Sequence, residues 1–177
     1  EGNRFRIDRE SVQSALSRAT RVLIFNAQHN PTGADADADD IEWLAALANE
    51  RDLWVLSDDP YHDIRYDGAA SQTMVGLAGI AERCVIGYTF SKKYAMTGWR
   101  LGAAVGPREV VDVITKLNTN DESCTNHFVQ LAGVEALTGD QGGAQTIVQT
   151  LAERREAVVG GLRAIDGVVV PDTAATF

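Results

Sequence analysis

Short apolar runs alternate with segments of helical periodicity along this chain, and that alternation limits its fold more than any other feature. Runs bounded by Pro, Gly or polar residues predict buried strands at 22–25, 54–56, 85–90, 101–105 and 168–170. Apolar positions at helical spacing predict helices over 41–48, 110–117, 128–137 and 147–162. Strands separated by helices favour an α/β layered fold in which the strands are at least partly parallel.

The composition excludes several classes of protein. The chain has 177 residues, enough for a domain with a sizeable core, and its 16 Lys+Arg against 25 Asp+Glu leave a net charge of −9. Such an acidic chain repels phosphate backbones and anionic lipid, so we expect no nucleic acid and no membrane as partner. Cys84 and Cys124 belong to no CxxC or Cys/His cluster, so we expect no disulfide scaffold, no metal site and a cytoplasmic location.

Polar and ionisable residues gather where three of the expected strands end. Ligands of open α/β sheets bind at the carboxyl ends of the strands, so these residues together form a site hypothesis. They are Asn30 after the first strand, Asp58 and Tyr61 after the second, and Thr89, Ser91 and Lys92 after the third.

The side chains at these strand ends match the needs of one cofactor. A lysine amine, Lys92 or Lys93, near low-dielectric strand ends can form a Schiff base with a carbonyl. The neighbouring hydroxyls and the guanidinium of Arg100 can clamp a phosphate, because arginine offers a fork of donors. Asp58 and Tyr61 remain to tune a heteroaromatic ring. An aldehyde, a phosphate, a pyridine nitrogen and a phenolic oxygen are together the functional groups of pyridoxal 5'-phosphate.

Three segments resemble the signature motifs of a known family. The class I/II, aspartate-aminotransferase-like, pyridoxal-phosphate enzymes carry similar segments in the same order, and the matching residues here are Asn30-Pro31-Thr32-Gly33, Ser57-Asp58-Asp59-Pro60-Tyr61 and Ser91-Lys92-Lys93-Tyr94-Ala95-Met96-Thr97-Gly98-Trp99-Arg100-Leu101-Gly102. Each motif is short, but all three in order are specific, and the resemblance extends over essentially the whole chain. It implies the large domain of a fold type I enzyme, which is a three-layer α/β/α sandwich with a mostly parallel mixed sheet, ending at the start of a small α/β domain.

The resemblance assigns the cofactor lysine and the phosphate site. Lys92 stands eight residues before Arg100, as the cofactor lysine stands before the phosphate-binding arginine in the family, and Lys93 is the alternative. Ser91 and Thr89 match the hydroxyl partners of the phosphate, although Thr89 stands where the family usually has Ser or Gly.

The resemblance also assigns the residues around the cofactor's ring. Asp58 matches the carboxylate that pairs with the pyridine N–H, and a helix cap is the alternative. Tyr61 and Asn30 match the donors to the ring's phenolic oxygen, with a core phenol and a turn-forming asparagine as their alternatives.

The function implied by the resemblance is that of an aminotransferase, which moves an amino group between an amino acid and a 2-oxo acid through a Lys92 Schiff base. A pyridoxal-phosphate-dependent β-lyase or synthase on the same scaffold is the alternative, and a non-catalytic aminotransferase-like domain or fragment is a third. Family members form homodimers with active sites at the interface, so the resemblance also implies a homodimer for the full-length protein.

The chain begins at Glu1 rather than Met, and the resemblance implies an internal segment of a longer protein. Residues 1–165 match part of the cofactor-binding large domain with the following interdomain helix, and residues 166–177 match the first strand of the small C-terminal domain. The glycine-bearing phosphate loop and the arginine for the substrate α-carboxylate are expected outside the chain. No arginine occurs between Arg108 and Arg154, which argues against the aspartate-specific subgroup.

Overall fold

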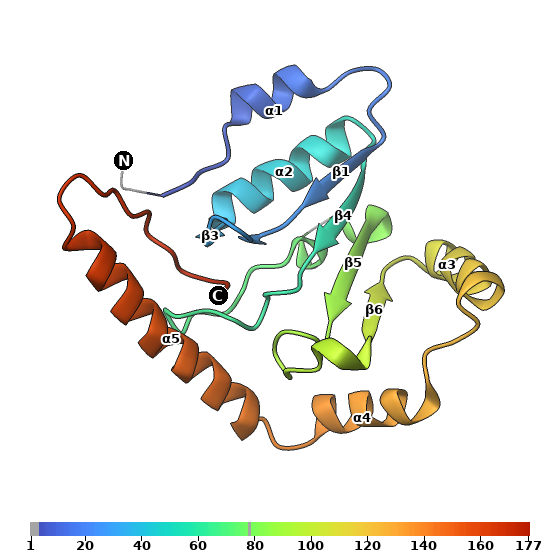
Figure 1. The fold of residues 1–177 in the computed structure, drawn as a ribbon. Coiled ribbons are helices and arrows are strands. Elements are labelled where there is room, and N and C mark those ends of the chain that lie inside the picture. Colours follow the sequence, from blue (N-terminus) through green and yellow to red (C-terminus); the bar gives the residue numbers. More distant parts are fainter. Residues whose placement is uncertain (1–3, 78) are drawn as a thin grey trace.

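The main sheet has four strands in the computed structural model, which describes residues 4–77 and 79–177 (Figure 1). The strand order is β1-β4-β5-β6, with β1 at Val22–Phe25, β4 at Trp54–Asp58, β5 at Cys84–Thr89 and β6 at Gly102–Val105. β4 pairs in parallel with both β1 and β5, and β6 pairs antiparallel with β5. The α/β class and the mixed, mostly parallel sheet expected from the sequence are therefore confirmed.

The register of the sheet brings the carboxyl ends of three strands to one edge. Phe25 pairs with Ser57, and Asp58 pairs with Gly87. The residues that follow β1, β4 and β5 consequently leave the sheet side by side, which is the arrangement that the strand-end hypothesis requires.

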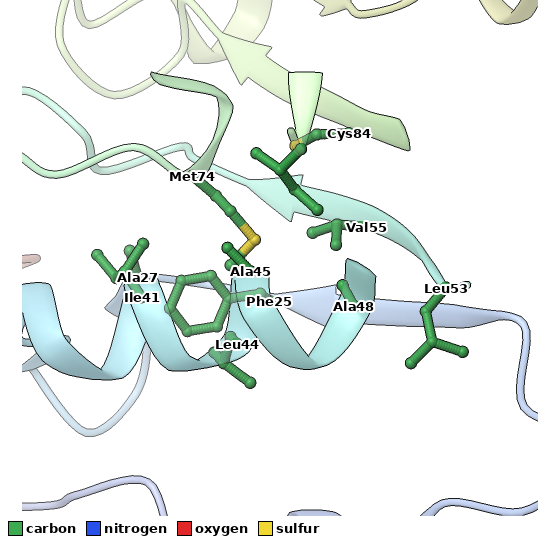
Figure 2. Packing of buried hydrophobic residues seen from close by; sticks show 11 residues of the cluster. Phe25, Ala27, Ile41, Leu44, Ala45, Ala48, Leu53, Val55, Met74 and Cys84 are labelled. Atoms are coloured by element: carbon green, nitrogen blue, oxygen red, sulfur yellow. The ribbon is translucent and has the colours of Figure 1, made fainter. Parts of the chain in front are cut away.

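One face of the sheet is covered by helix α2, Ala38–Glu50, and this contact forms the main core (Figure 2). Ile41 and Leu44 on the helix pack with Phe25 and Val55 on the strands, and each of these side chains is at most 8% exposed. Burying an apolar side chain of this kind stabilises the fold by about 1.5–3 kcal/mol. The other buried members of the cluster are Ala27, Ala45, Ala48, Leu53, Met74, Ile80 and Cys84.

Acidic residues mark the start of α2. Asp37 is the N-cap, and Asp39 and Asp40 lie in the first turn, where the helix dipole favours negative charge. Arg9 donates to Asp40 Oδ1 from Nε at 3.1 Å and from NH2 at 2.7 Å. This contact ties helix α1, Arg9–Ala15, to the start of α2.

The opposite face of the sheet is largely open within the described residues. Val22 and Ile24 on β1 and Leu56 on β4 alternate with the buried positions of these strands and are 52%, 72% and 37% exposed. The described chain thus supplies a helical layer on one face of the sheet and leaves apolar side chains exposed on the other.

Three α-helices follow the sheet: α3 at Arg108–Asp121, α4 at His127–Thr138 and α5 at Gly142–Arg163. They form an arc around the sheet in Figure 1. Val129 of α4 packs with Phe90, Met96 and Leu101 in a small second core cluster, and Gly133 of the same helix lies against Leu101 and Phe90. α5 is joined to the final segment by Arg155, whose guanidinium donates to the carbonyl oxygen of Thr173.

Some short elements differ from the sequence expectations. Helix α1 and the hairpin of β2, Gln28–His29, and β3, Ala34–Asp35, were not anticipated, because neither contains a run long enough to show a period. The strand expected at 168–170 is wrong, since these residues form no strand in the structure. The final segment pairs farther along the chain, where Ala175 forms a single antiparallel bridge with Arg65.

Three single-turn 3₁₀ helices complete the described elements, at Met74–Gly76, Ala81–Arg83 and Thr97–Trp99. After α5 the chain returns toward the sheet, and its end lies near the hairpin (Figure 1). Over the described ranges, none of the helices combines the length and the apolar character needed to cross a bilayer.

Candidate active site

The loop between β2 and β3 places the amide of Asn30 against Tyr61. Gly33 adopts φ +65° and closes the loop with a hydrogen bond from its N–H to the His29 carbonyl oxygen at 2.8 Å. A side chain at Gly33 would collide with Thr173, because an added Cβ would lie 2.5 Å from Thr173 Cγ2. Asn30 Nδ2 donates to the Tyr61 hydroxyl at 2.6 Å, so the two residues expected to contact the ring oxygen lie together.

Lys92 lies among aromatic rings at the end of β5. Its Nζ is 5.7 Å from the centre of the Tyr61 ring and 4.8 Å from that of Phe177, and these two rings meet edge to face at 5.3 Å. Within residues 4–77 and 79–177, no carboxylate lies within ion-pair distance of this amine. The amine of Lys92 is therefore not committed to a salt bridge.

Lys93 has a different environment. Its Nζ lies 3.2 Å from Asp63 Oδ1 and 5.1 Å from the centre of the Tyr94 ring. Burial lowers the pKa of Lys93, but its interactions with Tyr94 and Asp63 outweigh burial and raise the pKa above its ordinary value. Tyr88 donates to the other oxygen of Asp63 at 3.3 Å. These contacts hold Lys93 as a charged structural group, which favours Lys92 over Lys93 as the reactive lysine.

Asp58 ends β4 and is held by a residue from the neighbouring strand end. Asn26 Nδ2 donates to the carbonyl oxygen of Asp58 at 2.5 Å and approaches its carboxylate Oδ2 at 3.4 Å. The helices of the described ranges have other residues as N-caps, so the helix-cap alternative for Asp58 finds no support.

Asp59, the next residue along the chain, points the other way and is 4% exposed. Burial raises the pKa of its carboxyl above the ordinary value, although the hydrogen bond from the Ser57 hydroxyl at 2.9 Å opposes this shift. Two adjacent carboxyls thus have different environments, and the exposed one, Asp58, is the one available to a ligand.

The residues expected to bind phosphate lie on the turn between β5 and β6. Ser91 N–H donates to Thr89 Oγ1 at 3.1 Å, and the Thr97 hydroxyl donates to the Ser91 carbonyl oxygen at 3.2 Å. Arg100 adopts a left-handed φ of 55° and donates from NH1 to the Thr97 carbonyl oxygen at 3.0 Å. Arg100 makes no hydrogen bond to the hydroxyl of Thr89 or Ser91 in the part of the chain that the structure describes.

Arg100 also lines an open cleft of about 800 Å³, and none of the other expected cofactor residues lines it. Asn118 of α3 and Thr125 and Asn126 of the α3–α4 connection also line this cleft.

The structure adds two residues that the sequence argument missed. Asn26 is the first polar residue after β1, so the strand-end rule that selected Asp58 could have selected it as well. Phe177 contacts Lys92 only because the final segment folds back, and no local pattern marks it.

Pyridoxal 5'-phosphate fits this set of groups. The set offers an amine without a carboxylate partner at Lys92, a carboxylate at Asp58, and a linked amide and phenol at Asn30 and Tyr61. Asn26 Oδ1, on the residue that holds Asp58, is buried without a hydrogen-bond partner, so hydrogen-bonding capacity remains beside this carboxylate. These groups match an aldehyde, a pyridine nitrogen and a phenolic oxygen in turn.

Comparison of sequences identifies relatives of this chain. The model of the family "aminotransferase class I and II" matches residues 1–177. The aspartate aminotransferase of Musicola paradisiaca is 34% identical over 166 residues, which make up 94% of this chain and 42% of that protein. Aromatic-amino-acid aminotransferase 2 of Thermococcus litoralis is 37% identical over 141 residues, 80% of this chain and 36% of that protein. The chain spans less than half the length of these relatives.

Comparison of structures agrees with the sequence relatives. N-succinyldiaminopimelate aminotransferase of Mycobacterium tuberculosis superposes with a TM-score of 0.93 and 29% sequence identity, over 100% of this chain and 46% of that one. The fold of the chain is thus that of a fold type I aminotransferase domain. The chain belongs to the aminotransferase class I and II family, whose enzymes depend on pyridoxal 5'-phosphate.

Proposed function

We propose that the full-length protein is a pyridoxal-phosphate-dependent aminotransferase that moves an amino group between an amino acid and a 2-oxo acid. The observation that carries the proposal is the amine of Lys92, which lies 5.7 Å from the Tyr61 ring without a carboxylate partner in the described chain. When bound, the cofactor supplies an aldehyde for this amine and a ring that accepts the electron pair released at the substrate's α-carbon.

Lys92 has two roles in this proposal. Its amine would hold the cofactor in the resting enzyme. Once released by the substrate, the amine would take a proton from the substrate's α-carbon and give it to the cofactor's former aldehyde carbon. The position of its amine beside the rings of Tyr61 and Phe177, without a carboxylate partner in the described chain, supports this assignment, because no ion pair has to be broken before the amine reacts.

Asp58, Asn30 and Tyr61 are proposed to hold the ring. The carboxylate of Asp58 would pair with the ring nitrogen, and Asn26 fixes the backbone that carries it. Asn30 donates one amide hydrogen to the Tyr61 oxygen, which leaves the phenol hydrogen of Tyr61 and the second amide hydrogen free to face the ring oxygen.

Arg100, Ser91 and Thr89 are proposed to hold the phosphate. The guanidinium of Arg100 donates to a backbone carbonyl and opens onto the cleft, so a phosphate can become its partner without the loss of an ion pair. Thr89 Oγ1 already accepts a hydrogen bond from Ser91 N–H.

We also propose that the full-length protein is a cytoplasmic homodimer. The exposed apolar residues of α3 and α4 would support an interface on this side. They include Leu117, Phe128, Leu131 and Leu137. Residues 1–165 would then belong to the large domain and residues 166–177 to the start of the small domain.

The test uses the full-length protein, an amino acid and 2-oxoglutarate, with the visible cofactor band and the keto-acid product as readouts. Lys92→Ala should abolish the band and lower turnover by about 10²–10⁴-fold or more, because both the attachment and the proton transfer are lost. Lys93→Ala is the matched control and should keep the band. A band that persists in Lys92→Ala would refute the assignment, and pyruvate with ammonia from a thioether amino acid would indicate a β-lyase instead.

A further inference from the structure

A buried ion pair joins the two segments that carry Asn30 and Tyr61. Arg65 NH1 lies 2.7 Å from Asp35 Oδ2, and the two side chains are only 10% and 12% exposed. Gln28 Nε2 donates a further hydrogen bond to Asp35 Oδ1 at 2.9 Å. Removing one member of a buried pair leaves the other charge uncompensated, so the pair resists separation.

Arg65 is itself fixed by a second carboxylate. Its Nε and NH2 atoms donate to the two oxygens of Asp67 at 3.1 and 2.7 Å, the two-pronged geometry that suits a guanidinium. These hydrogen bonds lower the pKa of Asp67 to about 2 and raise the pKa of Arg65. Asp67 is 47% exposed and can be solvated, so Asp35 is the carboxylate that depends most on Arg65.

The hairpin links the position of Asp35 to that of Asn30. Both residues belong to the β2–β3 hairpin, in which His29 pairs with Ala34 and Gly33 N–H closes the turn. A displacement of Asp35 is therefore carried to Asn30, because the short turn between them has little freedom to absorb it.

The partner segment is equally short. Tyr61 and Arg65 are joined by a single turn, in which Ile64 N–H donates to the Tyr61 carbonyl oxygen at 2.9 Å. Within the described residues, hairpin and partner segment are joined directly by two side-chain links, Asn30–Tyr61 at the site and Asp35–Arg65 behind it. The second link thus ties together the two segments that carry the first.

We propose that Arg65 is a positioning residue, which acts through Asp35 to hold Asn30 within hydrogen-bond distance of Tyr61. The proposal rests on the proposed function, since the Asn30–Tyr61 pair is assigned there to the phenolic oxygen of the cofactor. Hydrogen-bond donors at this oxygen draw electron density from it, so it attracts the proton on the nitrogen between Lys92 and the cofactor less strongly. The presence or absence of that proton sets the colour of the bound cofactor.

Loss of Arg65 therefore has a defined spectroscopic consequence. A buried Asp35 with Gln28 as its remaining partner lowers its free energy by moving toward water, and the hairpin moves with it. The 2.6 Å contact between Asn30 and Tyr61 lengthens, and the phenolic oxygen loses donors. The pKa reported by the visible band should then rise.

The experiment titrates the visible band of the cofactor-loaded full-length protein against pH. Arg65→Met should raise the midpoint by about one pH unit, and Arg65→Lys, which keeps the charge, should restore most of the original value. Asp35→Asn leaves no buried carboxylate unpaired, so it should fold even where Arg65→Met does not, and it should shift the midpoint in the same direction. Arg83→Met, which breaks the more exposed 2.8 Å pair with Asp52, is the control and should leave the midpoint unchanged.

The outcomes separate the two proposals. A wild-type protein that forms no visible band with pyridoxal phosphate overturns the proposed function and the positioning role together. A normal band whose midpoint stays the same in Arg65→Met and Asp35→Asn, with only a lower melting temperature, overturns the positioning role alone. The double variant should shift no further than the larger single shift, since both changes break one link.

Discussion

The two halves of the chain differ in how their apolar side chains are used. In the first half, α2 buries Ile41 and Leu44 against β1 and β4, and the resulting core includes Met74 of the first 3₁₀ helix. In the second half, α3 and α5 contain no buried residue, and α4 buries only Val129 and Gly133. The contrast lies in packing, because both halves form regular helices.

The difference shows which part of the described chain is stabilised by its own buried apolar side chains. Hydrophobic burial is the main favourable contribution to folding, so the first half carries most of the stability of this chain. The apolar faces of the later helices, with side chains such as Leu131 and Leu137 at 58% exposure, contribute little until something covers them. The chain spans less than half of its relatives, in which further residues are available to do so.

The largest expected effect comes from a matched pair of helical leucines. Leu44→Ala, at a side chain 3% exposed in α2, should lower the free energy of unfolding by about 2–5 kcal/mol because it leaves a cavity. Leu131→Ala, at a side chain 58% exposed in α4, should change it by less than about 0.5 kcal/mol. Urea denaturation of both variants measures the difference, and equal losses would break the comparison between the halves.

The same contrast explains how much of the fold could be predicted from the sequence. β1 was predicted with its observed bounds, and β4 was predicted but extends two residues further, to Asp58, because apolar runs bounded by polar or turn residues mark buried strands directly. α1 could not be predicted, since its seven residues are too few to show a helical period. The strand at 168–170 was wrongly predicted because composition alone does not show where a pairing partner lies.

The candidate site shows a similar limit. The strand-end rule brought Asn30, Tyr61 and Lys92 together correctly as neighbours, because strand order and direction fix which ends meet. The Asp35–Arg65 pair could not be found this way, since it depends on how the short β2–β3 hairpin meets a later loop. Contacts set by the sheet were predictable, and contacts set by loop conformation were not.

A pair of helical glycines sharpens the comparison within the second half. A Cβ at Gly133 in α4 would lie 2.6 Å from Leu101 Cδ2, whereas one at Gly160 in α5 would meet nothing within 4 Å. Gly133→Ala should therefore destabilise by about 1–2 kcal/mol through overpacking, and Gly160→Ala should stabilise by about 0.5–1 kcal/mol through helix propensity. Thermal unfolding of both variants would show whether α4 is packed and α5 is open; a stabilising Gly133→Ala would contradict the packing of α4.

The smallest expected effect tests whether the packed half is stabilising throughout. Burial raises the pKa of Asp59, so between the ionisation of the unfolded carboxyl near pH ~3.9 and that of the folded one, the folded state binds more protons. Stability is then fully present below this window, falls as the pH rises through it, and stays reduced above it. Asp59→Asn keeps the acceptor for Ser57 and removes the titration, so at neutral pH it should be more stable than the wild type by on the order of 1 kcal/mol.

Urea unfolding at several pH values measures this difference, with Asp121→Asn on the exposed end of α3 as the control for the change in charge. The gain from Asp59→Asn should disappear as the pH falls below about 4, because the wild-type carboxyl is then neutral in both states. A gain that is the same at every pH would mean that packing, and not the buried charge, limits stability at this position. In that case ionisation of Asp59, the residue next to Asp58, would not destabilise the first half of the chain at neutral pH. The difference in packing between the two halves would then extend to the edge of the candidate site.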